Sequence, residues 1–139
     1  MGSHLSPEQN FACAPVNAWI GHRLLRCAPG SASVELAPRR EHLQETGIVQ
    51  GGVLTALADS AAVYAVVPAL PAGATVTGTQ AHMLFLRPGL ADAGPLAAES
   101  SALHLGRRTA VVAVEIRQQG KRIAHGDFSF LILPPTGEA

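Results

Sequence analysis

The pattern of apolar and polar positions predicts a short helix, a long helix and six strands. Ser6-Pro7-Glu8-Gln9 is typical of a helix start, with Ser6 as N-cap and Gln9 completing a capping box, and Pro15 interrupts this first helix. Residues 51–67 are rich in Ala and Leu and have no turn residue in their interior, so they predict a central helix. The predicted strands are 22–28, 33–36, 75–86, 96–105, 109–118 and 122–133.

This order predicts an α+β fold in which an antiparallel sheet of five or six strands packs on one apolar helix. Turn residues separate the last four strands and favour hairpin-like connections, namely Arg87-Pro88-Gly89, Gly106-Arg107-Arg108 and Gln119-Gly120-Lys121. The long helix is apolar nearly all round, so we expect a second copy of the chain to cover what one sheet leaves open. Residues 1–4 are typical of an expression-tag remnant, and residues 5–139 are expected to form a single domain.

Composition narrows the classes of function. Ten Lys and Arg balance ten Asp and Glu, which argues against a nucleic-acid-binding or membrane-surface protein, because those usually carry a basic excess. The most apolar stretch, residues 53–67, is shorter than the roughly 20 residues of a membrane span. Two cysteines, Cys13 and Cys27, are too few for a disulfide framework and lack metal-ligand spacing. We therefore expect a cytoplasmic protein without a metal site.

Asp59 is the most distinctive residue for chemistry. Histidine aside, it is the one ionisable acidic or basic residue between Glu45 and Arg87, and it lies in the middle of the apolar helix. An unpaired carboxylate is costly to bury, so Asp59 must be paired, protonated or open to a cleft. It can hydrogen bond to a backbone turn or to Thr55, or it can serve as a nucleophile or general base at a pocket wall.

Gly51 and Gly52 begin the same helix. Their unshielded N–H groups, together with the helix dipole, would stabilise an oxyanion, although a glycine pair also permits close packing of a helix on a strand. Asp59 follows Gly51 by eight residues, about 12 Å along a helix. One chain therefore cannot bring both groups to one carbonyl carbon, and joint action requires two antiparallel copies with two shared sites.

Five segments together resemble the hotdog-fold acyl-CoA thioesterases, in particular the phenylacetate-degradation-type branch related to 4-hydroxybenzoyl-CoA thioesterase. The segments are Leu43-Gln44 with Gly47, Gln50-Gly51-Gly52, Leu57-Ala58-Asp59-Ser60-Ala61, Phe85-Leu86-Arg87-Pro88-Gly89 and Gly106-Arg107-Arg108-Thr109-Ala110. The resemblance covers most of residues 15–133. It implies an antiparallel sheet wrapped around one long central helix.

The resemblance also implies hydrolysis of a CoA thioester with a small or medium, aryl or short acyl group. Asp59 would attack the thioester or activate water, the Gly51 N–H would be the oxyanion donor, and Gln44 would help to place the water or the thioester. The family usually has His where this chain has Gln50, and Gln can donate a hydrogen bond but does not titrate.

The remaining implied residues concern the next strand and the nucleotide. The family often has a Ser or Thr at the site, contributed by the strand after the helix. In this chain that residue would be Thr77 or Thr79, between which the sequence does not choose, and we take Thr79 as the candidate. Gly52, Arg107 and Arg108 are expected substrate-binding residues, the arginines toward the CoA phosphates. Coenzyme A belongs to the substrate, so no separate cofactor is expected, and we expect the homodimer with shared sites to assemble into a tetramer.

Two other functions stay open. One is a hotdog protein that binds acyl-CoA or a hydrophobic ligand without turnover, which the desolvation cost of Asp59 argues against. The other is a hotdog hydratase or dehydratase, whose motif pairs Asp with His near the helix start, where His42 is not suitably placed. The tripeptide His125-Gly126-Asp127 is not expected to form a catalytic pair, on the ground that adjacent strand residues face opposite sides.

Overall fold

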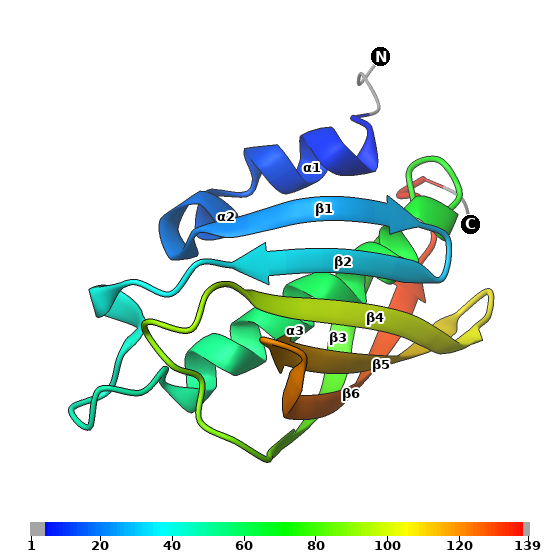
Figure 1. The fold of residues 1–139 in the computed structure, drawn as a ribbon. Coiled ribbons are helices and arrows are strands. Elements are labelled where there is room, and N and C mark those ends of the chain that lie inside the picture. The colour runs from blue at the N-terminus through cyan, green and yellow to red at the C-terminus, as the bar shows by residue number, and fades with distance from the viewer. Residues whose placement is uncertain (1–4, 138–139) are drawn as a thin grey trace.

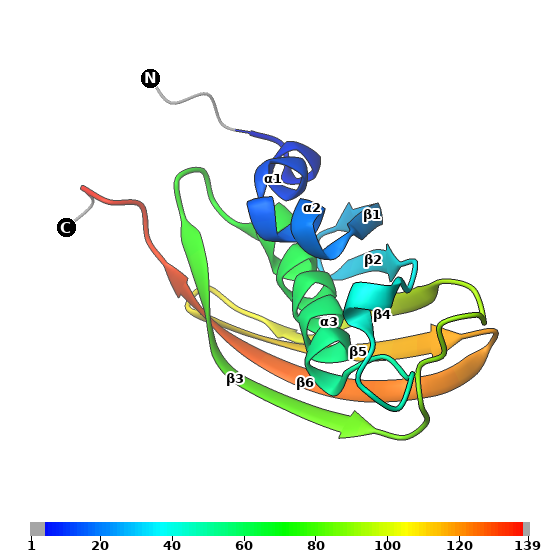
Figure 2. The ribbon, with the colours of Figure 1, turned by 90° about the vertical axis from the view of Figure 1, so that its left-hand side faces the viewer.

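The structure, a computed structural model, describes residues 5–137, and the expected tag remnant at residues 1–4 lies outside them. In this range a six-stranded antiparallel sheet curves around one long helix, α3 (Gly51–Val66) (Figures 1 and 2). The strands are β1 (His22–Ala28), β2 (Ser31–Leu36), β3 (Thr75–Phe85), β4 (Leu96–Leu105), β5 (Thr109–Gln118) and β6 (Lys121–Leu133). The expected hotdog arrangement is confirmed.

Two short helices and two 3-10 turns complete the described chain. They are α1 (Pro7–Cys13), α2 (Pro15–Ile20), η1 (Arg40–His42) and η2 (Val67–Ala69). The predicted capping box is present, since the Gln9 N–H donates to Ser6 Oγ at 3.2 Å and the Ser6 N–H donates to Gln9 Oε1 at 2.8 Å. Pro15 ends α1 as predicted, but it also starts α2, because proline fits the first turn of a helix.

The predicted hairpin between the third and fourth strands is wrong. The sheet order is β1-β2-β4-β5-β6-β3, so β3 pairs with β6 at one edge while β4 lies between β2 and β5. Residues 86–95, here named the crossing loop, carry the chain from that edge to the middle of the sheet (Figure 2). Arg87-Pro88-Gly89 therefore belongs to a crossover connection rather than to a hairpin turn. The prediction failed because the alternation of apolar and polar residues shows where strands lie but not which strands pair.

The helix α3 buries one side against the concave face of the sheet. Its buried residues are Leu54, Leu57, Ala58, Ala61, Ala62, Tyr64, Ala65 and Val66. The many alanines let the helix approach the sheet closely, where it meets Val34, Leu96, Val112, Val114, Ile116 and Phe128 of the core. The opposite side carries exposed Gly52 and Asp59, and no element within residues 5–137 packs over it.

By length and composition alone, the continuous helix formed by α3 and η2 is long and apolar enough to cross a membrane. The stretch 53–67, on which the expectation from the sequence rested, is too short for that. Gly51–Ala69 is 19 residues long with a mean hydropathy of 1.5, and 44% of its apolar window is buried inside this domain. Packing on the sheet accounts for that burial, as in other core helices.

Candidate active site

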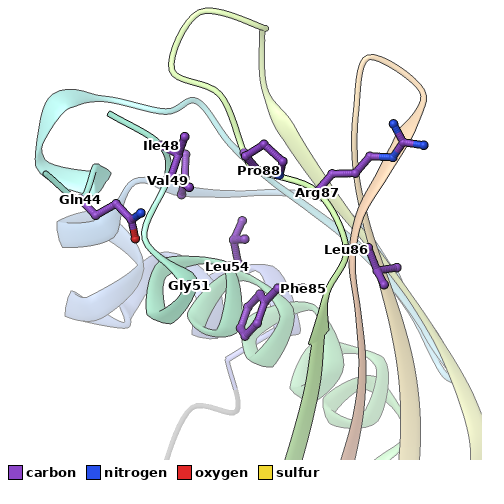
Figure 3. Close-up of a pocket in the computed structure, with 10 residues that line it drawn as sticks. Gln44, Ile48, Val49, Gly51, Leu54, Phe85, Leu86, Arg87 and Pro88 are labelled. Carbon is purple, nitrogen blue, oxygen red and sulfur yellow. The ribbon is translucent and has the colours of Figure 1, made fainter. Parts of the chain in front are cut away.

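The first turn of α3 borders a cleft of about 530 Å³. Its walls come from the crossing loop and from residues 43–50, here named the helix-entry loop. The lining residues are Gln44, Ile48, Val49, Gly51, Leu54, Phe85, Leu86, Arg87, Pro88 and Gly89. Figure 3 shows Gln44 on one side of this Gly51 cleft and Phe85 on the other, with Arg87 extending outward at the rim.

Gly51 and Gly52 have different neighbours. A Cβ at Gly51 would lie 3.4 Å from the Phe85 ring, and a Cβ at Gly52 would lie 2.7 Å from Gln50 Oε1. Close packing is therefore one reason for glycine at these two positions. The Gly51 N–H has no hydrogen-bond partner within residues 5–137 and lies at the positive end of the helix, where it can donate to an anionic oxygen.

Gln50 caps α3, a role that the sequence reasoning missed. Its side-chain Oε1 accepts from the Val53 N–H at 3.2 Å, and Gln50 is not among the residues that line the Gly51 cleft. Gln44 does line that cleft, and its Nε2 donates to Thr46 Oγ1 at 2.6 Å. The structure thus brings Gln44 and Gly51 together and turns Gln50 toward the helix end.

Asp59 lies in a second cleft, of about 500 Å³, between α3 and β3. It makes no hydrogen bond or ion pair with any residue in the range 5–137, and Thr55 Oγ1 donates instead to the Gly51 carbonyl at 3.0 Å. The partner that the sequence offered for a purely structural Asp59 is therefore not used. Partial desolvation in this cleft raises the pKa of the Asp59 carboxyl above its usual range.

Thr79, rather than Thr77, lines the Asp59 cleft. Thr79 is the unpaired residue of a β-bulge, because the register of β3 on β6 shifts between Gly78 and Gln80. A bulge turns one side chain out of the regular alternation, and such irregularities are common beside active sites. Thr77 stays in register opposite Leu131.

The two arginines predicted to bind phosphate lie elsewhere. Arg107 and Arg108 are exposed in the β4–β5 turn, and Arg107 borders a third cleft together with Val66 at the far end of α3. Fifteen residues separate Gly51 from Val66, about 22 Å along the helix. Within one chain the structure does not bring these arginines to the Gly51 cleft, whereas Arg87, to which the sequence reasoning gave no role, lies at its rim.

The reason given for excluding a His125–Asp127 pair is wrong, although the expectation that the pair is not catalytic stays a prediction. Residues two apart in a strand face the same side, so His125 Nε2 approaches Asp127 Oδ1 at 3.3 Å and His125 Nδ1 approaches Glu115 Oε1 at 2.9 Å. These carboxylates raise the pKa of the His125 ring. The cluster lines neither the Gly51 cleft nor the Asp59 cleft. Among the residues described, no three His, Cys, Asp or Glu side chains are placed to hold a metal ion.

Comparison with known proteins decides the family. Residues 46–125, more than half of the chain, match the thioesterase superfamily. The chain belongs to this superfamily. It is also 33% identical to a variant of the phenylacetic acid degradation protein PaaI from Thermus thermophilus, with a TM-score of 0.78 over 85% of this chain and 98% of that chain.

Two further relatives of this superfamily member bear on fold and length. A thioesterase from Haemophilus influenzae has a TM-score of 0.86 over 98% of this chain and 96% of that chain, and at 22% identity this likeness shows the shared fold alone. A protein of Archaeoglobus fulgidus named as a candidate esterase is 25% identical over 101 residues, which are 73% of this chain. The match spans 63% of the length of that curated relative.

Proposed function

We propose that this protein hydrolyses acyl-CoA thioesters with a small or medium aryl or short acyl group. Membership of the thioesterase superfamily supports thioester hydrolysis. The observation that carries the proposal is Asp59, a carboxylate without a partner in the described chain, in a cleft next to the bulged Thr79. A site that only binds an acyl chain gains little from such a carboxylate, because its desolvation is costly.

The chemistry follows from the charges that develop during hydrolysis. Asp59 either attacks the thioester carbonyl carbon or removes a proton from the attacking water. The carbonyl oxygen becomes negative, and the Gly51 N–H at the helix N-terminus stabilises it, while Gln44 orients the thioester or the water. The C–S bond then breaks and coenzyme A leaves as the thiolate. If Asp59 is the nucleophile, water then hydrolyses the mixed anhydride on its carboxylate; if Asp59 is the base, the acyl group leaves directly as the carboxylic acid. This scheme uses no cofactor apart from the coenzyme A of the substrate.

The proposed site is shared between two antiparallel copies. Gly51 and Asp59 border different clefts and are about 12 Å apart along α3, so one chain does not supply both groups to one carbonyl. If two helices crossed near Thr55, each Gly51 would approach the partner's Asp59. The uncovered side of α3 and the exposed edge strand β3 lie next to each other and would form such an interface. The outer face of the sheet would remain for assembly into a tetramer.

In this dimer each chain would offer an arginine to the CoA phosphates. Arg87 lies at the rim of the Gly51 cleft. Arg107 lies beside Val66, seven residues and about 10 Å beyond Asp59, and would therefore come from the chain that supplies the carboxylate.

The two free thiols, Cys13 and Cys27, support a reducing compartment such as the cytoplasm.

A panel of acyl-CoA esters with colorimetric detection of released thiol tests the proposal. The wild type should release thiol from at least one aryl or short-chain ester, and Asp59→Asn should lower kcat at least 10²-fold. Asp92→Asn, a change of an exposed carboxylate in the crossing loop, is the matched control and should retain activity. Tight acyl-CoA binding without thiol release by the wild type would instead identify a binding protein.

A further inference from the structure

Gln118, the last residue of β5, is a polar side chain in the core. It is 4% exposed and follows Ala110, Val112, Val114 and Ile116 in the buried phase of the strand. Its amide is fully engaged by the backbone of the crossing loop. The Oε1 accepts from the Leu90 N–H at 2.9 Å, and the Nε2 donates to the carbonyls of Leu90 and Gly94 at 2.8 and 2.9 Å.

The crossing loop is in turn pressed against the helix-entry loop. Leu90 forms a β-bridge with Ile48, and the Val49 N–H donates to the Gly89 carbonyl at 2.9 Å. A Cβ at Gly89 would lie 3.2 Å from that of Val49, so the two backbones are in close contact. Through Leu90 the Gln118 amide therefore holds the crossing loop, which forms one wall of the Gly51 cleft, and through these contacts it also supports the helix-entry loop, which forms the other.

We propose that Gln118 is a positioning residue for thioester hydrolysis, which holds both loops of the cleft over the Gly51 N–H. This inference rests on the proposed function, because it assigns a role in that same site. Gln118 does not line the cleft, so its effect passes through Leu90. Fixing the loops in advance places the Gln44 amide and the apolar walls at Ile48 and Pro88 relative to the oxyanion donor, and small displacements there are costly for catalysis.

The donor and acceptor pattern makes glutamine specific at this position. Two carbonyls require two N–H donors and one N–H requires an acceptor, a combination that an amide supplies. A carboxylate of the same shape would face two carbonyl oxygens and repel them, and it would regain one donor on protonation. Methionine keeps the length of the side chain and loses all three hydrogen bonds.

The test compares Gln118→Glu and Gln118→Met with Gln119→Glu, the same change at the exposed neighbour. We expect Gln118→Glu to lower kcat/KM at pH 8 at least tenfold and to recover part of it, relative to wild type, toward pH 5.5. Gln118→Met should lose activity at both pH values, and Gln119→Glu should match the wild type. Because Asp92 and Arg117 are also charged and lie in or near the loop, the pH dependence of Gln119→Glu, measured in parallel, shows how much of the change comes from groups other than residue 118.

Hydrogen exchange and binding separate this inference from the proposed function. The Leu90 amide should exchange faster in Gln118→Met, the Val49 amide should exchange faster in both Gln118 variants, and a non-hydrolysable thioether analogue of acyl-CoA should bind more weakly to both. If the wild type binds that analogue but hydrolyses no thioester, the proposed function fails while these two readouts still test the positioning. Wild-type kcat/KM and analogue affinity in a folded Gln118→Met variant with fast Leu90 exchange would overturn the inference. Should Gln118→Glu fail to fold, Gln118→Met alone decides.

Discussion

Asp59 would link the proposed chemistry of the site to the stability of the fold. Its cleft raises the pKa of the carboxyl in the folded chain above the value in the unfolded chain. The folded state therefore binds a proton more readily than the unfolded state. Any stability that the group contributes is present below the unfolded pKa and is lost as the pH rises through the folded pKa. At neutral pH the ionised carboxylate works against folding, a cost that the proposed reactivity of Asp59 would explain.

This sign leads to a prediction for Asp59→Asn. The variant should have a higher Tm than the wild type at pH 8, and the difference should shrink as the pH falls toward 4. The acid limb of the wild-type kcat/KM profile should lie above the pKa of an ordinary aspartate, which is about 3.9. Thermal unfolding and pH–rate profiles measure both effects. A lower Tm of Asp59→Asn at pH 8 would contradict the proposed environment of the carboxylate.

His22, at the start of β1, holds the N-terminal helices against α3. It is 8% exposed, and its Nδ1 lies 3.2 Å from Asn17 Oδ1 and 3.1 Å from Ser60 Oγ. Its Nε2 is buried without a hydrogen-bond partner in the described chain. Desolvation, with a smaller effect of His42, lowers the pKa of His22 to about 4. The ring is therefore neutral in the folded protein at physiological pH.

A histidine with a lowered folded pKa predicts acid sensitivity of this contact. Its contribution is fully present above the unfolded pKa of about 6.5 and is lost as the pH falls toward the folded value, to a total of about 3 kcal/mol. Urea unfolding of the wild type between pH 7 and 4 should show this loss. His22→Gln, which does not titrate, should show correspondingly less. Parallel stability curves for the two proteins would mean that His22 is not the group responsible.

The sequence predicted elements better than their partners, for reasons visible in single residues. The ends of β4 and β5 match the prediction because Gly106 and Gln119-Gly120 mark turns locally. The pairing of β3 with β6 is a long-range choice that alternation does not encode. Within the site, Gln44 and Gly51 were found from the spacing of a family motif, and the structure brings them into one cleft. No local sequence pattern indicated that Gln50 caps the helix or that Arg87 lies at the rim of the Gly51 cleft.

Gln118 shows what a closer examination of periodicity could have found. It is a polar residue at a position where the alternation of β5 requires an apolar one. Such a mismatch indicates that the side chain has buried hydrogen-bond partners. Which partners these are depends on the crossing loop, and the path of that loop follows from the long-range pairing of β3.

The arginines at the two ends of α3 give the proposed dimer a measurable charge pattern. If they contact the CoA phosphates, Arg107→Ala/Arg108→Ala should raise KM for CoA esters, and the effect should shrink as salt rises, because exposed charges are screened over about 8 Å at physiological ionic strength. The value of kcat should scarcely change, because contacts to the nucleotide are equal in the ground and transition states. The KM of Arg87→Ala, measured in the same way, tests the arginine on the chain that supplies Gly51. A short thioester without the nucleotide is the control, and equal losses on both substrates would assign the arginines to folding or assembly.

A shared site makes its strongest prediction for mixtures of inactive chains. In a mixed dimer of Asp59→Asn with Gln44→Ala, one site receives an intact Gln44 from the first chain and an intact Asp59 from the second. Random exchange of equal amounts should then restore about a quarter of wild-type activity. Asp59→Asn mixed with Thr79→Val is the matched control, because Asp59 and Thr79 line the same cleft of one chain and no mixed site contains both intact. That second mixture should show no gain. Equal behaviour of the two mixtures after demonstrated subunit exchange, or a monomer in sedimentation of the active protein, would exclude the shared site.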